Sequence, residues 1–307
     1  MYILALESST TSAKAMLYST KGGVVSLVTK EYLPENNDGR TQNPDGVFLQ
    51  TMLAGKQVSA GYRVDCIVLG GVWHSVFLCD RTMKPQTRVF SWADTSAAGL
   101  CDQIRKNKED ITSFYQKTGC MVNAIYPAFK LKSLREQGYR LEDYYIFGQG
   151  SYNTYRLTGK RIVTDCMASG SGLLNIRSRK YDEEILQDIG VGADQLCEVV
   201  SYNHQVPLSK EGADLLGLKE GIPVLPACAD GALNQVGAGA MGEGIMTFSV
   251  GTSAAIRLTT AQPILPQKPS TWCYLSPTLW LSGAASSGAC NCIDWFRENF
   301  YPSSYAE

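Results

Sequence analysis

Residue types that build metal centres and disulfide frameworks are scarce or scattered in this sequence. It has only two histidines in 307 residues, and its ten cysteines lie between Cys66 and Cys292 without a Cys-x-x-Cys pair. Structural zinc sites and disulfide frameworks need such residues at close, regular spacing. We therefore expect neither, and we interpret the cysteines as reduced, mostly buried small hydrophobes.

The sequence also lacks an excess of charge of either sign and lacks a long apolar run. Its formal net charge is -1, whereas binding to nucleic acid or to an anionic membrane usually requires a basic stripe or cluster. No apolar run is long enough to cross a bilayer, and the chain enters the strand-like "YILAL" without the charged region and cleavage site of a signal peptide. We expect a cytoplasmic protein with neither a nucleic-acid nor a membrane partner.

The composition is that of a globular protein with room for about two domains. Apolar residues make up 44% of the chain and charged residues 19%. After an initial antiparallel meander, strand-like runs such as 64–71 alternate with helical patterns such as 126–137, which favours an α/β fold with a parallel or mixed sheet. We place the domain boundary in the glycine-rich stretch 237–244, so that the two domains are residues 1–239 and 240–307.

Two segments far apart in the chain share a strand, a turn of small hydroxyl residues and a second strand. They are "ALESSTTSAKAMLY" (5–18) and "FSVGTSAAIRLT" (248–259). Such turns expose backbone N–H groups and hydroxyl donors that suit phosphate oxygens. One hairpin alone is better explained by the turn preference of serine and threonine, but the duplication favours phosphate binding. The candidate phosphate ligands are Thr10, Thr11, Lys14, Gly251, Thr252 and Ser253, and Glu7 is the candidate ligand for Mg²⁺.

The usual nucleotide motifs are missing. The sequence has neither a Walker A motif nor a dinucleotide-binding G-x-G-x-x-G between a strand and a helix, since "GAGAMGEG" has only a superficial likeness to it. A nucleotide would therefore bind through the two hairpins.

Eight segments, in order and with matching spacing, resemble the FGGY family of carbohydrate kinases, and within it the gluconokinase type. The family belongs to the actin-like, hexokinase-like ATPase superfamily. Each segment alone is a weak signal, but eight in sequence are a strong one. They are "LESSTTSAKA", "TQNPDGVF", "GGVWHSVFLCD", "WADTSA", "TGCMVNAIYPAFKLKSL", "LTGKRIVTDCMASGSGLLN", "ADGALNQVGAGA" and "FSVGTSAAIR".

The resemblance implies an actin-like (ribonuclease H-like) α/β ATPase domain, with a mixed β-sheet flanked by helices, followed by the beginning of a second copy. It implies phosphorylation of a sugar or sugar acid that depends on ATP and Mg²⁺, with gluconate as first choice and xylulose or another polyol as alternatives. Asp230 corresponds to the general base, although the cap of the following helix is an alternative role. Trp73, His74 and Asp94 occupy the sugar-contact segments, and Asp94 fits a helix cap equally well.

The sequence departs from the family pattern at the first hairpin. Glu7, Ser8 and Ser9 stand where the family has Asp, a spacer and Gly, and a serine would be strained if that turn needs a positive φ. Family members also continue past residue 307 into a glycine-rich adenine-binding segment, so the resemblance implies an unfinished second domain. Its exposed apolar face would favour self-association, which makes a homodimer one expected partner.

These departures keep two alternatives open. One is a truncated, catalytically inactive homologue that retains carbohydrate binding. The other is an actin-like or chaperone-like ATPase that is indifferent to sugar, which "GGVWHSVF" and "WADTSA" argue against because they resemble sugar-site elements.

Overall fold

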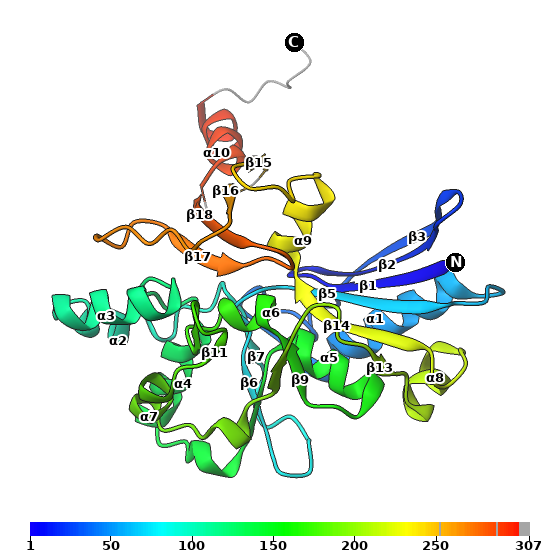
Figure 1. Ribbon diagram of the computed structural model, residues 1–307, viewed down its shortest axis with the longest axis horizontal. Coiled ribbons are helices and arrows are strands. Elements are labelled where there is room, and N and C mark those ends of the chain that lie inside the picture. The colour runs from blue at the N-terminus through cyan, green and yellow to red at the C-terminus, as the bar shows by residue number, and fades with distance from the viewer. Residues whose placement is uncertain (252, 287, 301–307) are drawn as a thin grey trace.

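The fold is organised around a mixed six-stranded β-sheet with the strand order β13-β14-β5-β1-β2-β3 (Figure 1). The structure, a computed structural model, describes residues 1–251, 253–286 and 288–300. The first three strands form the predicted antiparallel meander, β5 and β14 run parallel to β1, and β13 is antiparallel to β14. The strands are β1 (Tyr2–Ser8), β2 (Ser12–Ser19), β3 (Gly23–Glu31), β5 (Cys66–Gly71), β13 (Val206–Pro207) and β14 (Pro223–Ala229).

Alternating side chains give this sheet one apolar face and one face that is more polar. Leu4 and Leu6 of β1 point into the core, whereas Glu7 points to the other side and pairs across the ladder with Lys14 of β2. A shift of one residue in this register would bury both charges, so the apolar pattern fixes which face they occupy. The core face is covered by helices α1 (Pro44–Ser59), α5 (Gln149–Thr158) and α8 (Lys210–Leu216).

Helix α9 (Asp230–Gly237) lies on the opposite side of the sheet from α5, above β5 and β14 in Figure 1. It begins directly after β14, where the sequence had suggested a turn at Asp230 and Gly231. The ends of the three parallel strands are in register, because Ser8 of β1 and Ala229 of β14 both pair with Gly71 of β5. The residues that follow these three strands therefore lie close together at one edge of the sheet.

The chain between β5 and β14 adds a lobe of short elements beside the sheet. Its longest helices are α3, α4 and α5, of which α4 is the helix predicted at 126–137, and none of its strands among the described residues is longer than three residues. The remaining elements are β4 (Thr41–Gln42), β6 (Phe77–Cys79), β7 (Val89–Phe90), α2 (Ala98–Ile104), α3 (Lys108–Thr118), α4 (Pro127–Glu136), η1 (Leu141–Asp143), β8 (Tyr145–Phe147), β9 (Ile162–Thr164), α6 (Asp165–Ser169), β10 (Leu174–Asn175), β11 (Lys180–Tyr181), α7 (Glu183–Ile189), η2 (Ala193–Gln195) and β12 (Glu198–Val200).

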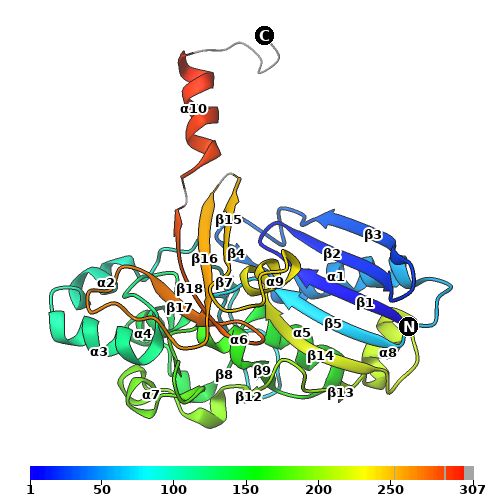
Figure 2. The same ribbon diagram turned by 45° about the horizontal axis from the view of Figure 1, so that its top comes forward.

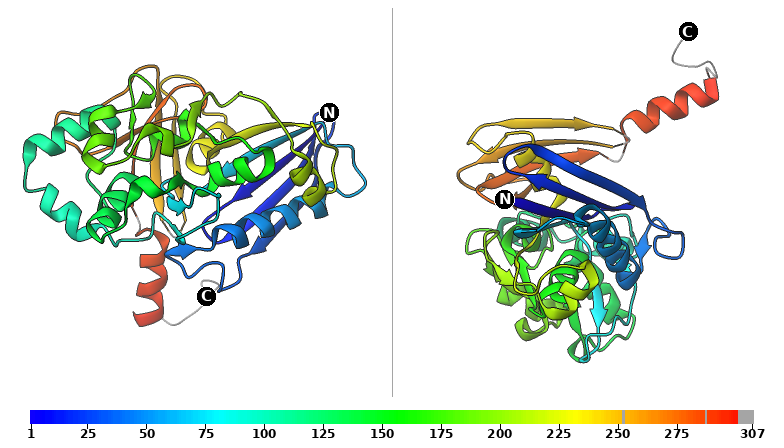
Figure 3. Two further views of the ribbon diagram at one scale, coloured as in Figure 1. Left: turned by 90° about the horizontal axis from the view of Figure 1, so that it is seen from below. Right: turned by 90° about the vertical axis from the view of Figure 1, so that its right-hand side faces the viewer.

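A second sheet follows α9 and begins with the predicted second hairpin. This antiparallel four-stranded sheet has the order β15-β16-β18-β17, and the predicted boundary between residues 239 and 240 falls in the loop that precedes it. Helix α10 stands apart from both sheets in Figure 2 and in the right-hand view of Figure 3. The elements are β15 (Met246–Val250), β16 (Ala254–Thr260), β17 (Trp272–Leu275), β18 (Trp280–Ser286) and α10 (Cys290–Phe300).

Buried polar contacts fix the second sheet against the first part of the chain. The side chain of Gln235 on α9 is fully buried; its Nε2 donates to Thr259 Oγ1 at 2.8 Å, and its Oε1 accepts from the hydroxyl of Thr247. At the other end, Cys273 N donates to Gly119 O at 2.9 Å and Leu275 N donates to Ser169 Oγ at 2.9 Å. Both ends of the sheet are thus held in place.

The exposure of apolar side chains and of the cysteines can be compared with the expectations from the sequence. The outer face of the second hairpin and helix α10 expose large apolar side chains, including Phe248 at 70% and Trp295 at 59%. The ten cysteines are free and seven of them are buried, which confirms their interpretation as small hydrophobes. Among the described residues, no helix is both long and apolar enough to span a bilayer.

Gly119 is the point where the end of α3 meets β17, and it should tolerate no side chain. Its φ is 69°, and a Cβ atom there would overlap the carbonyl oxygen of Cys273. We expect Gly119→Ala to lower the free energy of unfolding by about 1–2 kcal/mol for the left-handed backbone and by about 1–3 kcal/mol more for the overlap. Urea unfolding measures both contributions together.

Gly159 provides the matched control for this variant. It ends α5 with a φ of 71° and the same type of hydrogen bond, from its N–H to the carbonyl four residues back, but a Cβ there would meet nothing within 4 Å. Gly159→Ala should therefore show the backbone cost alone. Equal losses in the two variants would contradict the close approach of β17 to Gly119.

Candidate active site

The predicted site residues follow the ends of the three parallel strands. The hydroxyl turn starts after Ser8 of β1, Trp73 and His74 follow β5, and Asp230 follows β14. Open α/β sheets bind ligands outside the carboxyl ends of parallel strands. The in-register ends of these strands therefore place all three segments where a ligand is expected.

A cleft of about 1000 Å³ lies between the open face of the first sheet and the second hairpin. Its charged lining comes from both sheets. The cleft brings together two of the predicted residues on the first hairpin and the predicted base, and adds a residue that the sequence analysis did not select. These four are Glu7, Lys14, Asp230 and Arg257.

Asp230 is the first residue of α9, and its carboxyl group is mostly buried. The cap position belongs to Ala229, so the alternative in which Asp230 caps the helix is wrong. The carboxylate accepts the Gly231 N–H at 2.7 Å, and the backbone N–H of Trp73 favours its charged form. Burial raises the pKa of Asp230 to about 6, and the charge of Glu7 adds to the rise, while the two N–H groups and Arg257 oppose it.

Glu7 and Lys14 form a cross-strand ion pair within the cleft, with Lys14 Nζ 3.3 Å from Glu7 Oε2. Both side chains are partly exposed, so this pair adds little stability and either group is available to a ligand. Among the described residues, no cluster of three or more His, Cys, Asp or Glu side chains could hold a metal. A single carboxylate facing the cleft fits Mg²⁺, which is usually held by one or two carboxylates together with phosphates and water.

The first hydroxyl turn is closed by its own side chains. Ser9 Oγ donates to Ser12 O at 2.7 Å and accepts from Ser12 N. Among the described non-glycine residues, only His74, Met83 and Arg179 have a positive φ. The condition under which Ser9 would be strained is therefore not met, because the turn does not use the conformation that requires glycine.

Side chains from distant segments hold the next residue of this turn. Gln42 Nε2 donates to Thr10 O at 2.9 Å, Asn37 Nδ2 donates to the same oxygen at 3.0 Å, and Trp92 Nε1 donates to Thr10 Oγ1 at 3.1 Å. Sequence reasoning did not select these three residues, although two of them lie in the quoted segments "TQNPDGVF" and "WADTSA". Thr11 is exposed at the tip of the turn.

The second turn is more open. Gly251 N donates to Ser253 O at 2.8 Å, and both residues are exposed. Thr252 lies outside the described residues. Neither described residue of this turn, nor Thr10 or Thr11, lines the cleft itself; the strands that carry the turns do.

Trp73 lies behind Asp230 rather than in the cleft lining. Its indole is buried, and Nε1 donates to Cys166 O at 3.0 Å. The ring packs against α9 so closely that a Cβ atom at Gly231 would be 2.9 Å from it. In this structure Trp73 thus supports the base through its backbone N–H and through packing.

His74 has a left-handed backbone, with a φ of 62°, which costs energy in a residue other than glycine. Its Nδ1 lies 2.6 Å from Gly170 O, and since a carbonyl can only accept, Nδ1 carries the proton and Nε2 is left as an acceptor. Burial lowers the pKa of His74 to about 4, so the ring is neutral at pH 7. It packs edge-on against Tyr126 and Tyr274, with ring centroids 5.1 and 5.4 Å away.

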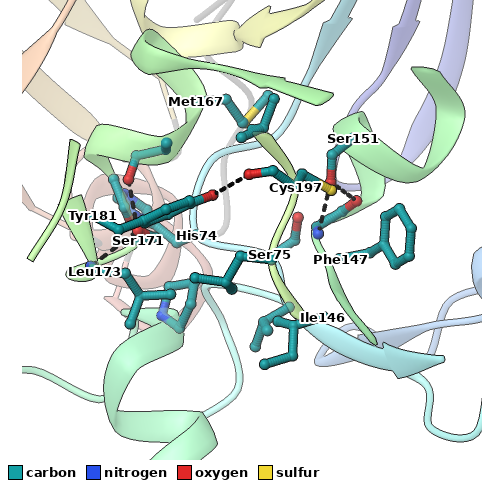
Figure 4. A pocket seen from close by; sticks show the side chains of 17 residues that line it. His74, Ser75, Ile146, Phe147, Ser151, Met167, Ser171, Leu173, Tyr181 and Cys197 are labelled. Carbon is teal, nitrogen blue, oxygen red and sulfur yellow. Dashed lines mark hydrogen bonds between the residues drawn. The ribbon is translucent and has the colours of Figure 1, made fainter. Parts of the chain in front are cut away.

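A separate small cavity adjoins His74 (Figure 4). Its volume is about 60 Å³, and its lining is mainly apolar, with Ile146, Phe147 and Met167 among the labelled side chains. Tyr181 donates to Cys197 O at 2.8 Å at its edge. This cavity has room for a few water molecules and is too small for a six-carbon polyol, so the larger cleft is the better substrate site.

Asp94 is engaged away from the cleft. Its carboxylate accepts from the N–H and the hydroxyl of Ser96 and lies 3.5 Å from Lys130 Nζ. Lys130 is fully buried, donates to Ser91 O and Asp94 O at 2.8 Å each, and has its pKa lowered to about 8 by burial. The surroundings of Asp94 thus match the role of a local cap more closely than that of a group facing the cleft.

Arg257 is the charged cleft residue that sequence reasoning missed. It lies on β16, and Nη1 donates to Ser249 Oγ at 3.2 Å. The sequence does contain a feature that could have identified it. Arg257 is a basic residue within the second, largely apolar arm of the hairpin, a position similar to that of Lys14 in the first hairpin.

Comparison with known sequence families gives one match over most of the chain. Residues 2–237 match the profile of the N-terminal domain of the FGGY family of carbohydrate kinases. The gluconokinase of Bacillus licheniformis is 28% identical over 316 aligned residues, which cover 98% of this chain and 60% of that protein. The chain thus spans about 60% of the length of the curated gluconokinases that it matches.

Solved structures with the same fold include a xylulose kinase and a gluconate kinase from Lactobacillus acidophilus. The first has a TM-score of 0.91 at 26% identity and covers 99% of this chain and 64% of that one. The second has a TM-score of 0.89 at 26% identity and covers 96% of this chain and 62% of that one. These similarities confirm the predicted actin-like α/β fold with its central mixed sheet.

Asp230→Asn should stabilise the protein in a pH-dependent way. The pKa of Asp230 rises from 3.8 to about 6, so the folded state holds the proton more tightly. The stability gained from that proton is present below about pH 4 and is lost as the pH rises through about 6. Because asparagine stays neutral, we expect the advantage of the variant to be about 2 kcal/mol larger at pH 8 than at pH 4.5, measured by urea unfolding.

Asp214→Asn is the control, because it changes an exposed carboxyl group on α8 that lies outside the cleft lining. A stability difference between Asp230→Asn and the unaltered chain that stays constant from pH 4.5 to 8 would contradict the buried, proton-binding carboxyl group described above.

Proposed function

Because this chain belongs to the FGGY family of carbohydrate kinases, we propose that it transfers the γ-phosphoryl group of ATP to a hydroxyl group of a sugar or sugar acid. Gluconate is the first candidate acceptor, and xylulose or another polyol is an alternative. One observation supports this proposal above all. The Asp230 carboxyl group faces a cleft that is shared by strands of both hairpins.

Asp230 is the general base of this proposal. With a pKa of about 6 it is mostly ionised at pH 7, yet it remains basic enough to accept a proton, which is the range that suits general base catalysis. The N–H groups of Gly231 and Trp73 orient the carboxylate. The acceptor hydroxyl gives its proton to Asp230 as its oxygen bonds to phosphorus, and the bond from phosphorus to the leaving oxygen breaks to release ADP.

The hairpins hold the phosphates in this proposal. Lys14 supplies a positive charge next to the cleft, and Glu7 is the carboxylate that would hold Mg²⁺, which would neutralise charge on the phosphate oxygens. The turns supply hydroxyl and N–H donors, and the first of them is already held in place by Gln42, Asn37 and Trp92. The proposed turn ligands are Thr10, Thr11, Gly251, Thr252 and Ser253.

The acceptor is proposed to contact the segments after β5. His74 lines the small cavity rather than the cleft, so in this proposal its free Nε2 meets a substrate hydroxyl group that reaches that cavity, and its strained backbone is typical of functional positions. The buried indole of Trp73 lies behind Asp230, so we propose that it serves the acceptor by holding the base in place. The carboxylate of Asp94 is already hydrogen-bonded to Ser96 and lies 3.5 Å from Lys130 Nζ, so we propose a supporting role for it rather than direct contact with the acceptor.

Asp230→Asn should lower phosphorylation by at least about 10²-fold, because asparagine cannot accept the hydroxyl proton. The 307-residue chain is incubated with ATP, Mg²⁺ and each of gluconate, xylulose and glycerol, and ADP release is followed. For the unaltered chain, kcat/KM should fall as the pH drops below about 6, because protonation of Asp230 removes the base.

Asp214→Asn should leave the rate unchanged. A chain that binds one of these polyols but releases no ADP would support the non-catalytic binding protein instead. ATP hydrolysis that does not respond to any polyol would support the sugar-independent ATPase.

A further inference from the structure

Arg257 contributes a positive charge to the cleft from the second hairpin. On β16 it pairs with Thr247 of β15, and its side chain shares a face of this hairpin with Ser249 and the buried Ala255. The opposite face of the hairpin carries the exposed Phe248 and Ile256. The strand alternation therefore directs Arg257 toward the first sheet and into the cleft that it lines.

The guanidinium group of Arg257 has more donors than the structure satisfies. Within the described part of the chain, its one hydrogen bond runs from Nη1 to Ser249 Oγ, and its Nε is buried without a partner. No carboxylate of the described chain lies within 4.0 Å of it. An arginine has five N–H donors and stays charged at any ordinary pH, so a buried and unpaired N–H is costly until an anion meets it.

Arg257 lies close to the proposed base without forming an ion pair with it. A Cβ atom at Gly231 would be 3.4 Å from Arg257 Nη2, so the guanidinium reaches the first turn of α9 next to Asp230. The charge of Arg257 lowers the pKa of Asp230. Because both groups line the cleft without pairing with each other, both are available to a ligand there.

Arg257 is the cation of the cleft that lacks a partner. Lys14 has Glu7 as its partner at 3.3 Å, whereas Arg257 has no carboxylate partner among the described residues. Arg257 also lies four residues beyond Ser253, so the second phosphate turn is about 13 Å away along the strand at ~3.3 Å per residue. An anion that enters the cleft next to Asp230, whether a carboxylate of the acceptor or the γ-phosphate that the acceptor must meet, would therefore contact Arg257.

We propose that Arg257 binds the carboxylate of the acceptor, so that the site selects a polyhydroxy acid over a neutral polyol. This inference rests on the proposed function and specifies its substrate class. A guanidinium binds a carboxylate through two parallel hydrogen bonds, and Arg257 has the free donors for them. A neutral polyol would leave the buried N–H unpaired, and sites of this kind discriminate strongly against ligands that lack the matching group.

The test compares ligands that differ only in charge. Isothermal titration calorimetry of the 307-residue chain measures binding of gluconate and of gluconamide, its neutral amide. We expect gluconate to bind about 10- to 100-fold more tightly than gluconamide, because the amide lacks the charge that strengthens the hydrogen bonds from Arg257. Arg257→Met should abolish this preference while leaving gluconamide binding within about twofold, and Arg257→Lys should retain part of it.

Arg63→Met is the matched control, since Arg63 has a side chain that is 89% exposed and lies outside the cleft lining. It should preserve the preference. Thermal unfolding of each variant shows whether Arg257→Met is folded, and the conservative lysine variant tests the proposal if it is not.

Three outcomes would overturn the inference. Equal affinity of the unaltered chain for gluconate and gluconamide would overturn it alone and leave the proposed kinase activity standing. Weaker binding of ADP by Arg257→Met, with the gluconate preference unchanged, would make Arg257 a phosphate ligand. Failure of every polyol and polyol acid to bind would overturn both this inference and the proposed function.

Discussion

The site depends on the alignment of three parallel strands whose ends are in register. Ser8, Gly71 and Ala229 lie side by side at one edge of the sheet, so the residues that follow them converge although the first and the last of these positions are more than 200 residues apart in the sequence. This alignment follows from the apolar residues that alternate along β1, β2 and β5. The chemistry of the cleft is thus set by the packing of the opposite face of the sheet.

The second hairpin belongs to a different sheet, and its position relative to the first sheet depends on a small network of polar side chains. Gln235 of α9 is buried between Thr247 and Thr259, one on each strand of the hairpin. A buried amide is tolerated only when its donors and acceptors are satisfied, so these bonds define one orientation of the hairpin against α9. Because α9 begins at Asp230, the same contact sets where Arg257 lies relative to the proposed base.

The parts of the structure that follow local rules could be predicted from the sequence. The meander, strand β5, helix α4 and both hairpins have clear alternation or helical periodicity, and the mixed α/β fold followed from them and from the family resemblance. The cleft lining was only partly predictable. All four charged residues lie in quoted motifs, but Arg257 was not selected, because only the long-range packing of the second hairpin shows that its side chain faces the cleft beside Asp230.

The same distinction explains the residues whose surroundings differed from expectation. A serine in the first turn suggested strain, but its hydroxyl group closes the turn in a way that local sequence does not reveal. Asp94 looked equally suited to a pocket or a cap, and only the fold brings the buried Lys130 next to it. Trp73 was selected for its ring as a sugar-contact surface, yet its indole is buried against the first turn of α9, behind Asp230.

Burial links the two charged groups that the described chain leaves unpaired in the cleft. Glu7 and Lys14 neutralise each other at 3.3 Å, whereas Asp230 and Arg257 form no such pair. Burial raises the pKa of Asp230 and lowers the pKa of Arg257, which means that each charge is disfavoured where it lies. A ligand with a hydroxyl at one end and an anion at the other would relieve both costs, since it gives Asp230 a proton donor and gives Arg257 a negative partner. A direct ion pair between the two would instead close the space in which that ligand must lie.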